Sequence, residues 1–212
     1  MRRFYQESWQ GIPFTSFSHI SFFHLAEPKF YAVFYEELFR RYKNWEDLPS
    51  VWRENKRTDA KWLIGQLRAK LAQDPAGRME PVRVLSIGSG VGYMEKILLE
   101  EMPELELHVN EPSTVGMKWL REYIPSDRIY IGLPPMCLPS DVQYDMIYLS
   151  TVDYGIPTRE FQHLLWELRA QLAPGGELVL LSASLLEEDS FIGSFVNAIK
   201  IGIRAALHYM GI

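Results

Sequence analysis

Apolar positions recur at helical spacing in the first third of the chain. A helix is predicted from Pro28 to about Lys43, because two adjacent stripes of apolar side chains repeat every three to four residues. The charged stretch at 44–57 predicts a loop. A second helix is predicted to begin near Thr58 or Asp59, since either side chain can cap a helix N-terminus. Its core-facing stripe consists of Ala60, Leu63, Ile64, Leu67 and Leu71.

Beyond residue 81 the pattern changes to short apolar runs that alternate with helical or turn-rich segments. Strands are predicted at 82–87, 106–110, 128–131, 145–149 and 177–182. Helices are predicted at 93–102, at 113–123 with Ser113 as the cap, and at 158–172. This order predicts an α/β fold with a doubly wound, mostly parallel, Rossmann-like sheet. The chain accordingly divides into an aromatic-rich helical cap or lid at 1–80 and the α/β domain at 81–212.

A final amphipathic helix is predicted at 190–212. Only Lys200 and Arg204 are basic on its polar face, so packing on the sheet or on a second subunit is favoured over contact with a membrane surface. This helix, or an exposed edge of the sheet, is the surface expected to form a homodimer.

Composition narrows the class of protein. The chain has 212 residues and a net charge of −5, which argues against nucleic acid as a partner. The basic residues Arg40, Arg41 and Lys43 are interpreted as a solvated helix end. The single cysteine, Cys137, cannot form an internal disulfide, which favours a cytoplasmic location. No signal peptide and no membrane span is predicted, because every apolar run is too short.

The stretch VLSIGSGVGYME joins a predicted strand to a predicted helix through Gly88, Gly90 and Gly92. Glycine lets backbone N–H groups approach a ligand closely, because no Cβ intervenes. The dinucleotide fingerprint requires its third glycine at position 93, where this chain has Tyr93, so a nicotinamide cofactor is disfavoured. Glu111 ends the next strand about 20 residues later, where a carboxylate can accept hydrogen bonds from both hydroxyls of a ribose.

Four segments, VLSIGSGVGYME, LHVNEPS, YDMIYLSTV and LAPGGELVLLS, resemble class I S-adenosylmethionine-dependent methyltransferases in order and spacing, over about residues 82–184. The resemblance implies S-adenosylmethionine as cofactor and S-adenosylhomocysteine as product. It assigns Glu111 to the ribose, Pro112 to the adenine, and the end of the fourth strand (149–151) to the methionine part. The implied cofactor-binding residues are Ser86, Gly88, Ser89, Gly90, Gly92, Glu111, Pro112, Leu133 and Ser150.

Three departures from the family pattern accompany this resemblance. Ser86 stands where the family often has an acidic residue two positions before the first glycine. Leu133 and Pro134 stand where an acid often meets the adenine amine, so backbone groups are expected to replace it. The last two strands of the usual seven-stranded sheet are expected to be missing.

The proposed reaction is methyl transfer to a small-molecule acceptor. The segment STVDYGIP lacks the Asn/Asp-Pro-Pro-aromatic signature of relatives that methylate amides and bases, which favours an oxygen acceptor. The cofactor is already activated, so a general base is optional and no catalytic residue is assigned. Candidate bases are Asp153, Tyr154, His19 and His24. No cluster has metal-ligand spacing, and Cys137 has no visible partner that would make it a nucleophile.

Two other functions are compatible with the same glycine turn. The first is transfer of the aminopropyl or aminocarboxypropyl arm of the same cofactor, which leaves methylthioadenosine instead of S-adenosylhomocysteine. The second is a degenerate methyltransferase-like module that binds without turnover. The three departures support the second alternative, and a titration with the cofactor would separate it from both enzymes.

Overall fold

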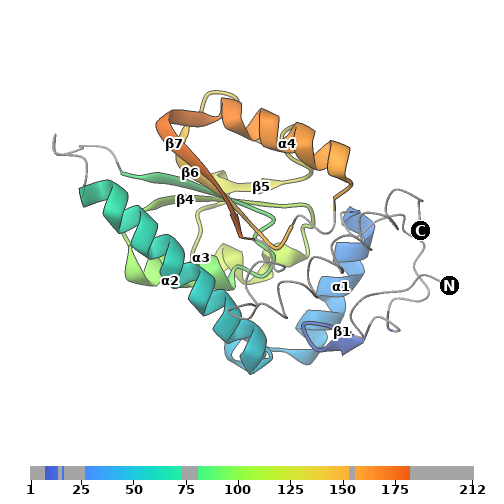
Figure 1. Cartoon of the computed structure of the whole chain (residues 1–212). Helices are drawn as coiled ribbons and strands as arrows, with labels where there is room; N and C mark the ends of the chain where they lie inside the picture. The colour runs from blue at the N-terminus through green and yellow to red at the C-terminus, as the bar shows by residue number, and fades with distance from the viewer. Residues whose placement is uncertain (1–7, 14–15, 17–26, 73–80, 153–155, 182–212) are drawn as a thin grey trace, which may run out of the picture.

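The computed structural model describes residues 8–13, 16, 27–72, 81–152 and 156–181 (Figure 1). The predicted helix at 190–212, with its expected subunit contact, lies outside the described residues. The candidate bases Asp153, Tyr154, His19 and His24 also lie outside them.

The core of the structure is a sheet of five described strands in the order β5-β4-β3-β6-β7, and every pairing is parallel. The strands are β3 (Arg83–Ile87), β4 (Glu106–Glu111), β5 (Ile129–Ile131), β6 (Tyr144–Ser150) and β7 (Leu172–Leu181). The chain runs from β3 outward to β5 and then returns to β6 on the other side of β3. This order confirms the doubly wound sheet and puts the topological switch point at the carboxyl ends of β3 and β6, where such sheets bind ligands.

Helices cover both faces of the sheet. Helix α4 lies on one face, and α2 and α3 lie on the other together with α1 (Figure 1). Their bounds are α1 (Pro28–Arg41), α2 (Ser50–Ala72), α3 (Tyr93–Glu101) and α4 (Thr158–Ala170). Consecutive side chains of β3 lie on opposite faces of the sheet. Val84 packs in the hydrophobic cluster with α1, α2 and α3, whereas Leu85 packs in the cluster with Leu164 and Leu168 of α4. Side chains of α1 and α2 pack into the same hydrophobic core as the sheet, so this packing does not mark a domain boundary. The predicted division of the chain at residue 80 remains a prediction.

Helix α2 corrects the predicted start of the second helix. The helix begins at Ser50, not near Thr58 or Asp59, and the N–H of Arg53 already donates to the carbonyl of Pro49 at 3.0 Å. The charged segment after Ser50 forms the first two turns of the helix, because Arg, Glu and Lys are good helix formers even without an apolar stripe. Asp59 caps nothing; it lies inside the helix and is 3% exposed.

The segment after β4 also differs from the prediction. Instead of an α-helix from 113 to 123, the chain forms two short 3₁₀ helices, η3 (Gly116–Lys118) and η4 (Leu120–Glu122). Met117 and Leu120 are both fully buried, and their three-residue spacing matches the period of a 3₁₀ helix. Gly116 allows this packing, since a Cβ there would lie 2.8 Å from the ring of Tyr35 in α1.

Strand β7 begins earlier than predicted. The segment at 173–176, between the predicted helix and the predicted strand, is part of β7 and contains a bulge, because the register shifts between Tyr144 and Met146 of the neighbouring strand. Gly176 lies against β6, where a Cβ would meet the carbonyl oxygen of Tyr144 at 2.7 Å. The other strands and helices predicted between residues 81 and 181, together with α1, are confirmed to within a few residues.

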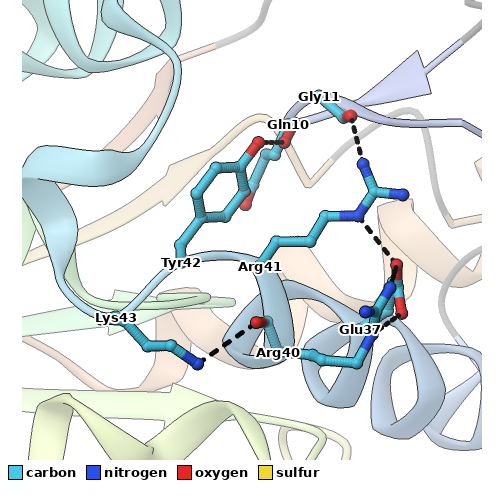
Figure 2. Close-up of polar contacts among 7 residues, drawn as sticks. All are labelled: Gln10, Gly11, Glu37, Arg40, Arg41, Tyr42 and Lys43. Carbon is cyan, nitrogen blue, oxygen red and sulfur yellow. Dashed lines mark hydrogen bonds and ion pairs between the residues drawn. The ribbon is translucent and has the colours of Figure 1, made fainter.

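A two-residue hairpin joins β1 (Ser8–Trp9) to β2 (Ile12–Pro13) and is tied to the end of α1 (Figure 2). Gln10 and Gly11 both have positive φ, 48° and 74°, as a type I′ turn requires. Tyr42 Oη donates to the Gln10 carbonyl at 3.2 Å, and Arg41 donates to the Gly11 carbonyl at 3.3 Å.

The basic residues at the end of α1 are exposed and, besides the contact of Arg41 with the hairpin, they interact with residues of this helix (Figure 2). Arg40 and Arg41 both pair with Glu37, at 2.7 and 2.8 Å. Their hydrogen bonds lower the pKa of Glu37 to about 2. The ammonium of Lys43 donates to the carbonyl of Arg40 at 3.3 Å, near the negative end of the helix dipole. This arrangement agrees with the interpretation of the cluster as a solvated helix end.

The glycine that opens α3 provides a test of the fold. Gly92 has φ of 76°, and a Cβ there would overlap Leu120. Gly92→Ala is therefore expected to lower the free energy of unfolding by about 1–3 kcal/mol, through backbone strain and overpacking. Gly65→Ala in α2 is the matched control, because no atom lies within 4 Å of the added Cβ. It should raise stability by about 0.5–1 kcal/mol. Urea unfolding of both variants checks the prediction, and equal effects would contradict it.

Candidate cofactor-binding site

A cavity of about 370 Å³ lies at the carboxyl ends of β3, β4 and β6 and is closed by residues of α1 and α2. This volume lies within the range of small-molecule and cofactor sites. The cavity is lined by all of the predicted site residues except Gly92, namely Ser86, Gly88, Ser89, Gly90, Glu111, Pro112, Leu133 and Ser150. Gly92 instead packs beside Leu120, so its role in the structure is to let the chain turn into α3.

The N–H groups of the glycine turn are mostly used within the protein. Gly88 and Ser89 donate to the carbonyl of Asn110 at 2.9 and 3.0 Å. Gly90 donates to Glu111 Oε2 at 3.0 Å, and Gly92 donates to the carbonyl of Ser89 at 3.1 Å. We expected these groups to face a ligand, but four of them are already paired. A diphosphate, which binds through such free N–H groups, fits this turn poorly.

Glu111 connects the end of β4 to the glycine turn. Its side chain is 2% exposed, and its two oxygens accept from the N–H groups of Gly90 and Ser113 at 3.0 and 3.2 Å. Burial raises the pKa of Glu111 to about 7, although these hydrogen bonds and one from Tyr35 act in the opposite direction. Each carboxylate oxygen has two acceptor positions, and Gly90, Ser113 and Tyr35 occupy three of the four. One position is open to a ligand hydroxyl, and a second hydroxyl would take the place of Tyr35.

A second buried carboxylate, Glu95, lies in the first turn of α3 and lines the cavity. Ser86 and Tyr148 both donate to its Oε1 at 2.6 Å. Glu95 stands at the positive end of the helix dipole, where a dinucleotide fold would hold the ligand's diphosphate. An acidic group there disfavours an anionic ligand and favours a cationic one. Glu95 was not among the predicted site residues, although its position three residues after Gly92 is typical of a residue whose side chain caps a helix N-terminus.

Lys56 brings a buried ammonium to the same end of the cavity from α2. Its Nζ donates to Ser150 Oγ at 2.6 Å and to Thr151 Oγ1 at 3.1 Å, and lies 3.6 Å from Asp59 Oδ2. Burial lowers the pKa of Lys56 and raises the pKa of Asp59. Thr151 has φ of 57°, a strained conformation for a β-branched residue and one that often marks a functional site. Lys56 lies in the segment that was predicted to be a loop, and no role was predicted for it.

Aromatic side chains of α1 and α2 form another wall of the cavity. Tyr31, Phe34 and Tyr35 come from α1 and Trp52 from α2. The rings of Tyr31 and Tyr35 stack with centroids 5.9 Å apart. This wall is suited to an apolar or planar ligand.

Cys137 lies near the cavity but shows no sign of nucleophilic activation. It is half-buried, its Sγ accepts from Asn110 Nδ2 at 3.2 Å, and burial raises the pKa of the thiol. Within the described residues no group of three or more His, Cys, Asp or Glu side chains could hold a metal ion. No helix in this part of the chain has the length and apolar character that a membrane span needs.

Comparison with solved structures finds similarity to methyltransferases. DesVI from Streptomyces venezuelae is 16% identical, with a TM-score of 0.46 over 59% of this chain and 50% of its own. The sugar N-methyltransferase KedS8 from Streptoalloteichus sp. is 16% identical, with a TM-score of 0.44 over 57% and 46%. The amino pentose methyltransferase CalS10 from Micromonospora echinaspora is 21% identical, with a TM-score of 0.45 over 69% and 55%. The matched part spans about half the length of these structures.

No protein-family model and no curated protein matches the sequence. The fold itself is read from the parallel order of the strands, the glycine turn after the central strand, and the carboxylate that ends the next one. The described residues therefore have the Rossmann-like α/β fold expected from the resemblance to class I S-adenosylmethionine-dependent methyltransferases.

Proposed function

We propose that this chain binds S-adenosylmethionine and transfers its methyl group to a small molecule. The proposal rests on the chemistry of the glycine turn. Its N–H groups are paired within the protein, and Glu95 lies in the first turn of the helix that follows, so the turn does not offer a free site for an anion. A nucleoside that carries positive charge and no phosphate suits this site better than a dinucleotide. Glu111 would accept the ribose hydroxyls, and Pro112 and Leu133 would contact the adenine.

The residues of the chain would bind and orient the reactants. When bound, S-adenosylmethionine supplies an activated methyl group, whose transfer to a nucleophile leaves S-adenosylhomocysteine. The aromatic wall of α1 and α2 would hold the acceptor beside this methyl group and exclude water. An oxygen nucleophile is proposed, because the segment after β6 lacks the signature of enzymes that methylate amides and bases. The acceptor loses a proton as the new bond forms, and no described residue is assigned as its base.

Calorimetric titration with S-adenosylmethionine and S-adenosylhomocysteine tests the cofactor. Micromolar binding of both ligands would support the proposal, and the absence of binding would overturn it. Mass spectrometry of the spent cofactor then tests the reaction with candidate acceptors. S-adenosylhomocysteine indicates methyl transfer, whereas methylthioadenosine indicates transfer of the aminopropyl or aminocarboxypropyl arm. Binding without either product would favour the non-catalytic module.

The raised pKa of Glu111 predicts that cofactor affinity depends on pH. Since this pKa is about 7, the carboxyl is largely protonated at lower pH and must release its proton to accept both ribose hydroxyls. Affinity for S-adenosylhomocysteine is therefore expected to rise with pH and to level off above about pH 8, with a loss of up to about tenfold per pH unit below about 7. Calorimetry across this range measures the effect. Glu111→Gln should bind more weakly and lose the dependence, and an equal slope in the variant would contradict the assignment.

A further inference from the structure

One end of the cavity contains opposite charges that come from different helices. Lys56 enters from α2 and Glu95 from α3, and both line the cavity. The attraction between them is one of the influences that raise the pKa of Lys56 and lower that of Glu95, although burial dominates both. Ser150 and Thr151, at the end of β6, lie next to the ammonium.

Only one of the two carboxylate oxygens of Glu95 has hydrogen-bond donors among the described residues. Its Oε1 accepts from both Ser86 and Tyr148, whereas its Oε2 is buried and has no hydrogen-bond partner among the described residues. The residue is 2% exposed, so bulk water is not an adequate partner. A buried carboxylate oxygen without a donor is costly, which indicates that a ligand supplies the donor. The best donor for a carboxylate in such a place is a cation.

Lys56 complements this arrangement. Its ammonium lies 3.6 Å from Asp59 and donates at shorter distances to the neutral hydroxyl groups of Ser150 and Thr151. A ligand carboxylate is a stronger acceptor for an ammonium than a hydroxyl is, so it can join or replace them. Glu95, Asp59 and Lys56 together carry one net negative charge when all are ionised, which suits a ligand with a net positive charge.

We propose that this end of the cavity binds an α-amino-acid zwitterion, the methionine end of the cofactor, with Glu95 receiving the ammonium and Lys56 the carboxylate. The inference rests on the proposed function and assigns two residues that the sequence resemblance does not include. It also explains Ser86: the acid expected at this strand position comes instead from α3, and the serine hydroxyl holds it in place at 2.6 Å. Lys56 makes the N-terminal helical segment part of the cofactor site.

The test compares two ligands that differ in the amino-acid part. S-adenosylhomocysteine has the zwitterion, and methylthioadenosine has the same adenosine thioether without it. Calorimetry is done on the full chain and on Lys56→Met and Glu95→Gln. Lys61→Met and Glu100→Gln are matched controls, because these residues lie exposed on the same two helices. Thermal unfolding of every variant shows whether it is folded.

The wild type is expected to bind S-adenosylhomocysteine more tightly than methylthioadenosine. Each site variant should lose roughly tenfold or more in affinity for S-adenosylhomocysteine, the size of one charge-assisted hydrogen bond, and should bind methylthioadenosine like the wild type. The controls should leave both affinities unchanged. A merely structural role for either residue would weaken both ligands equally. That result, or unchanged binding of S-adenosylhomocysteine, would overturn the inference. If the wild type binds neither ligand, the proposed function fails as well.

Discussion

Replacing Glu111 with alanine is expected to weaken binding of S-adenosylmethionine about 100-fold or more. The carboxylate lies at the junction of β4 and the glycine turn, is 2% exposed, and already holds the N–H group of Gly90 at 3.0 Å. Alanine would remove two acceptors for the ribose hydroxyls, and each hydrogen bond to a charged group contributes about 1.5–3 kcal/mol. It would also leave the N–H of Gly90 without this partner, which loosens the turn that faces the ligand.

Calorimetry with S-adenosylhomocysteine, which is stable during the titration, measures this loss. Glu111→Gln separates binding from folding, because an amide oxygen still accepts one hydrogen bond in the same place. Its affinity should lie between those of the wild type and the alanine variant. Glu104→Ala is the exposed control and should bind like the wild type. If a folded Glu111→Ala protein bound S-adenosylhomocysteine with wild-type affinity, the proposal that Glu111 binds the ribose would be contradicted.

Replacing Trp45 with alanine is expected to lower the melting temperature by roughly 10 °C. This residue lies in the short helix η2 (Trp45–Asp47) between α1 and α2 and is 7% exposed. Its ring packs against Trp119 and Tyr123 with centroids 5.2 Å away in each case. Its Nε1 donates to the carbonyl of Val91 at 2.9 Å. Truncation of a buried tryptophan costs about 3–5 kcal/mol, and about 2–4 °C is lost per kcal/mol in a chain of this size.

Differential scanning calorimetry measures the shift and shows whether there is a single transition. Trp62→Ala in α2 is the matched control, because this tryptophan is 49% exposed, and it should change the melting temperature by only about 1–2 °C. Trp45→Phe should fall between them, since it keeps ring packing and loses the hydrogen bond to Val91. If Trp45→Ala unfolded one part of the chain and left a second transition intact, the N-terminal segment would be an independent domain.

The two predictions concern the same connection between the N-terminal helices and the α/β sheet. Trp45 donates a hydrogen bond to the carbonyl of Val91 in the glycine turn, and Lys56 of α2 lines the cavity. Tyr35 packs on Gly116 and contributes a hydrogen bond that lowers the pKa of Glu111. A variant that loosens α1 or α2 should therefore weaken cofactor binding together with stability.

The sequence by itself determined the elements that have a strong local pattern. The short apolar run before Gly88 predicted β3, and the recurrence of such runs predicted the doubly wound sheet. The position of Glu111 after the second strand was sufficient to place it at the cavity, because in a parallel sheet the residues after neighbouring strands meet at one edge. Local pattern failed where tertiary packing competes with it, as in the 3₁₀ helices that replaced the expected helix at 113–123.

Only the tertiary structure decided which polar side chains complete the site. Lys56 and Asp59 interrupt the apolar stripe of α2 and therefore suggested a loop and a cap, but they are inside the helix because each finds an opposite charge or a hydroxyl nearby. Glu95 is separated from Tyr148 by 53 residues, and they come together because α3 covers the face of the sheet to which β6 contributes. Hydrophobic periodicity indicates which side of a single helix or strand is buried. A charged side chain is buried only where another element supplies a partner for it. This part of the site could therefore not be predicted from the sequence.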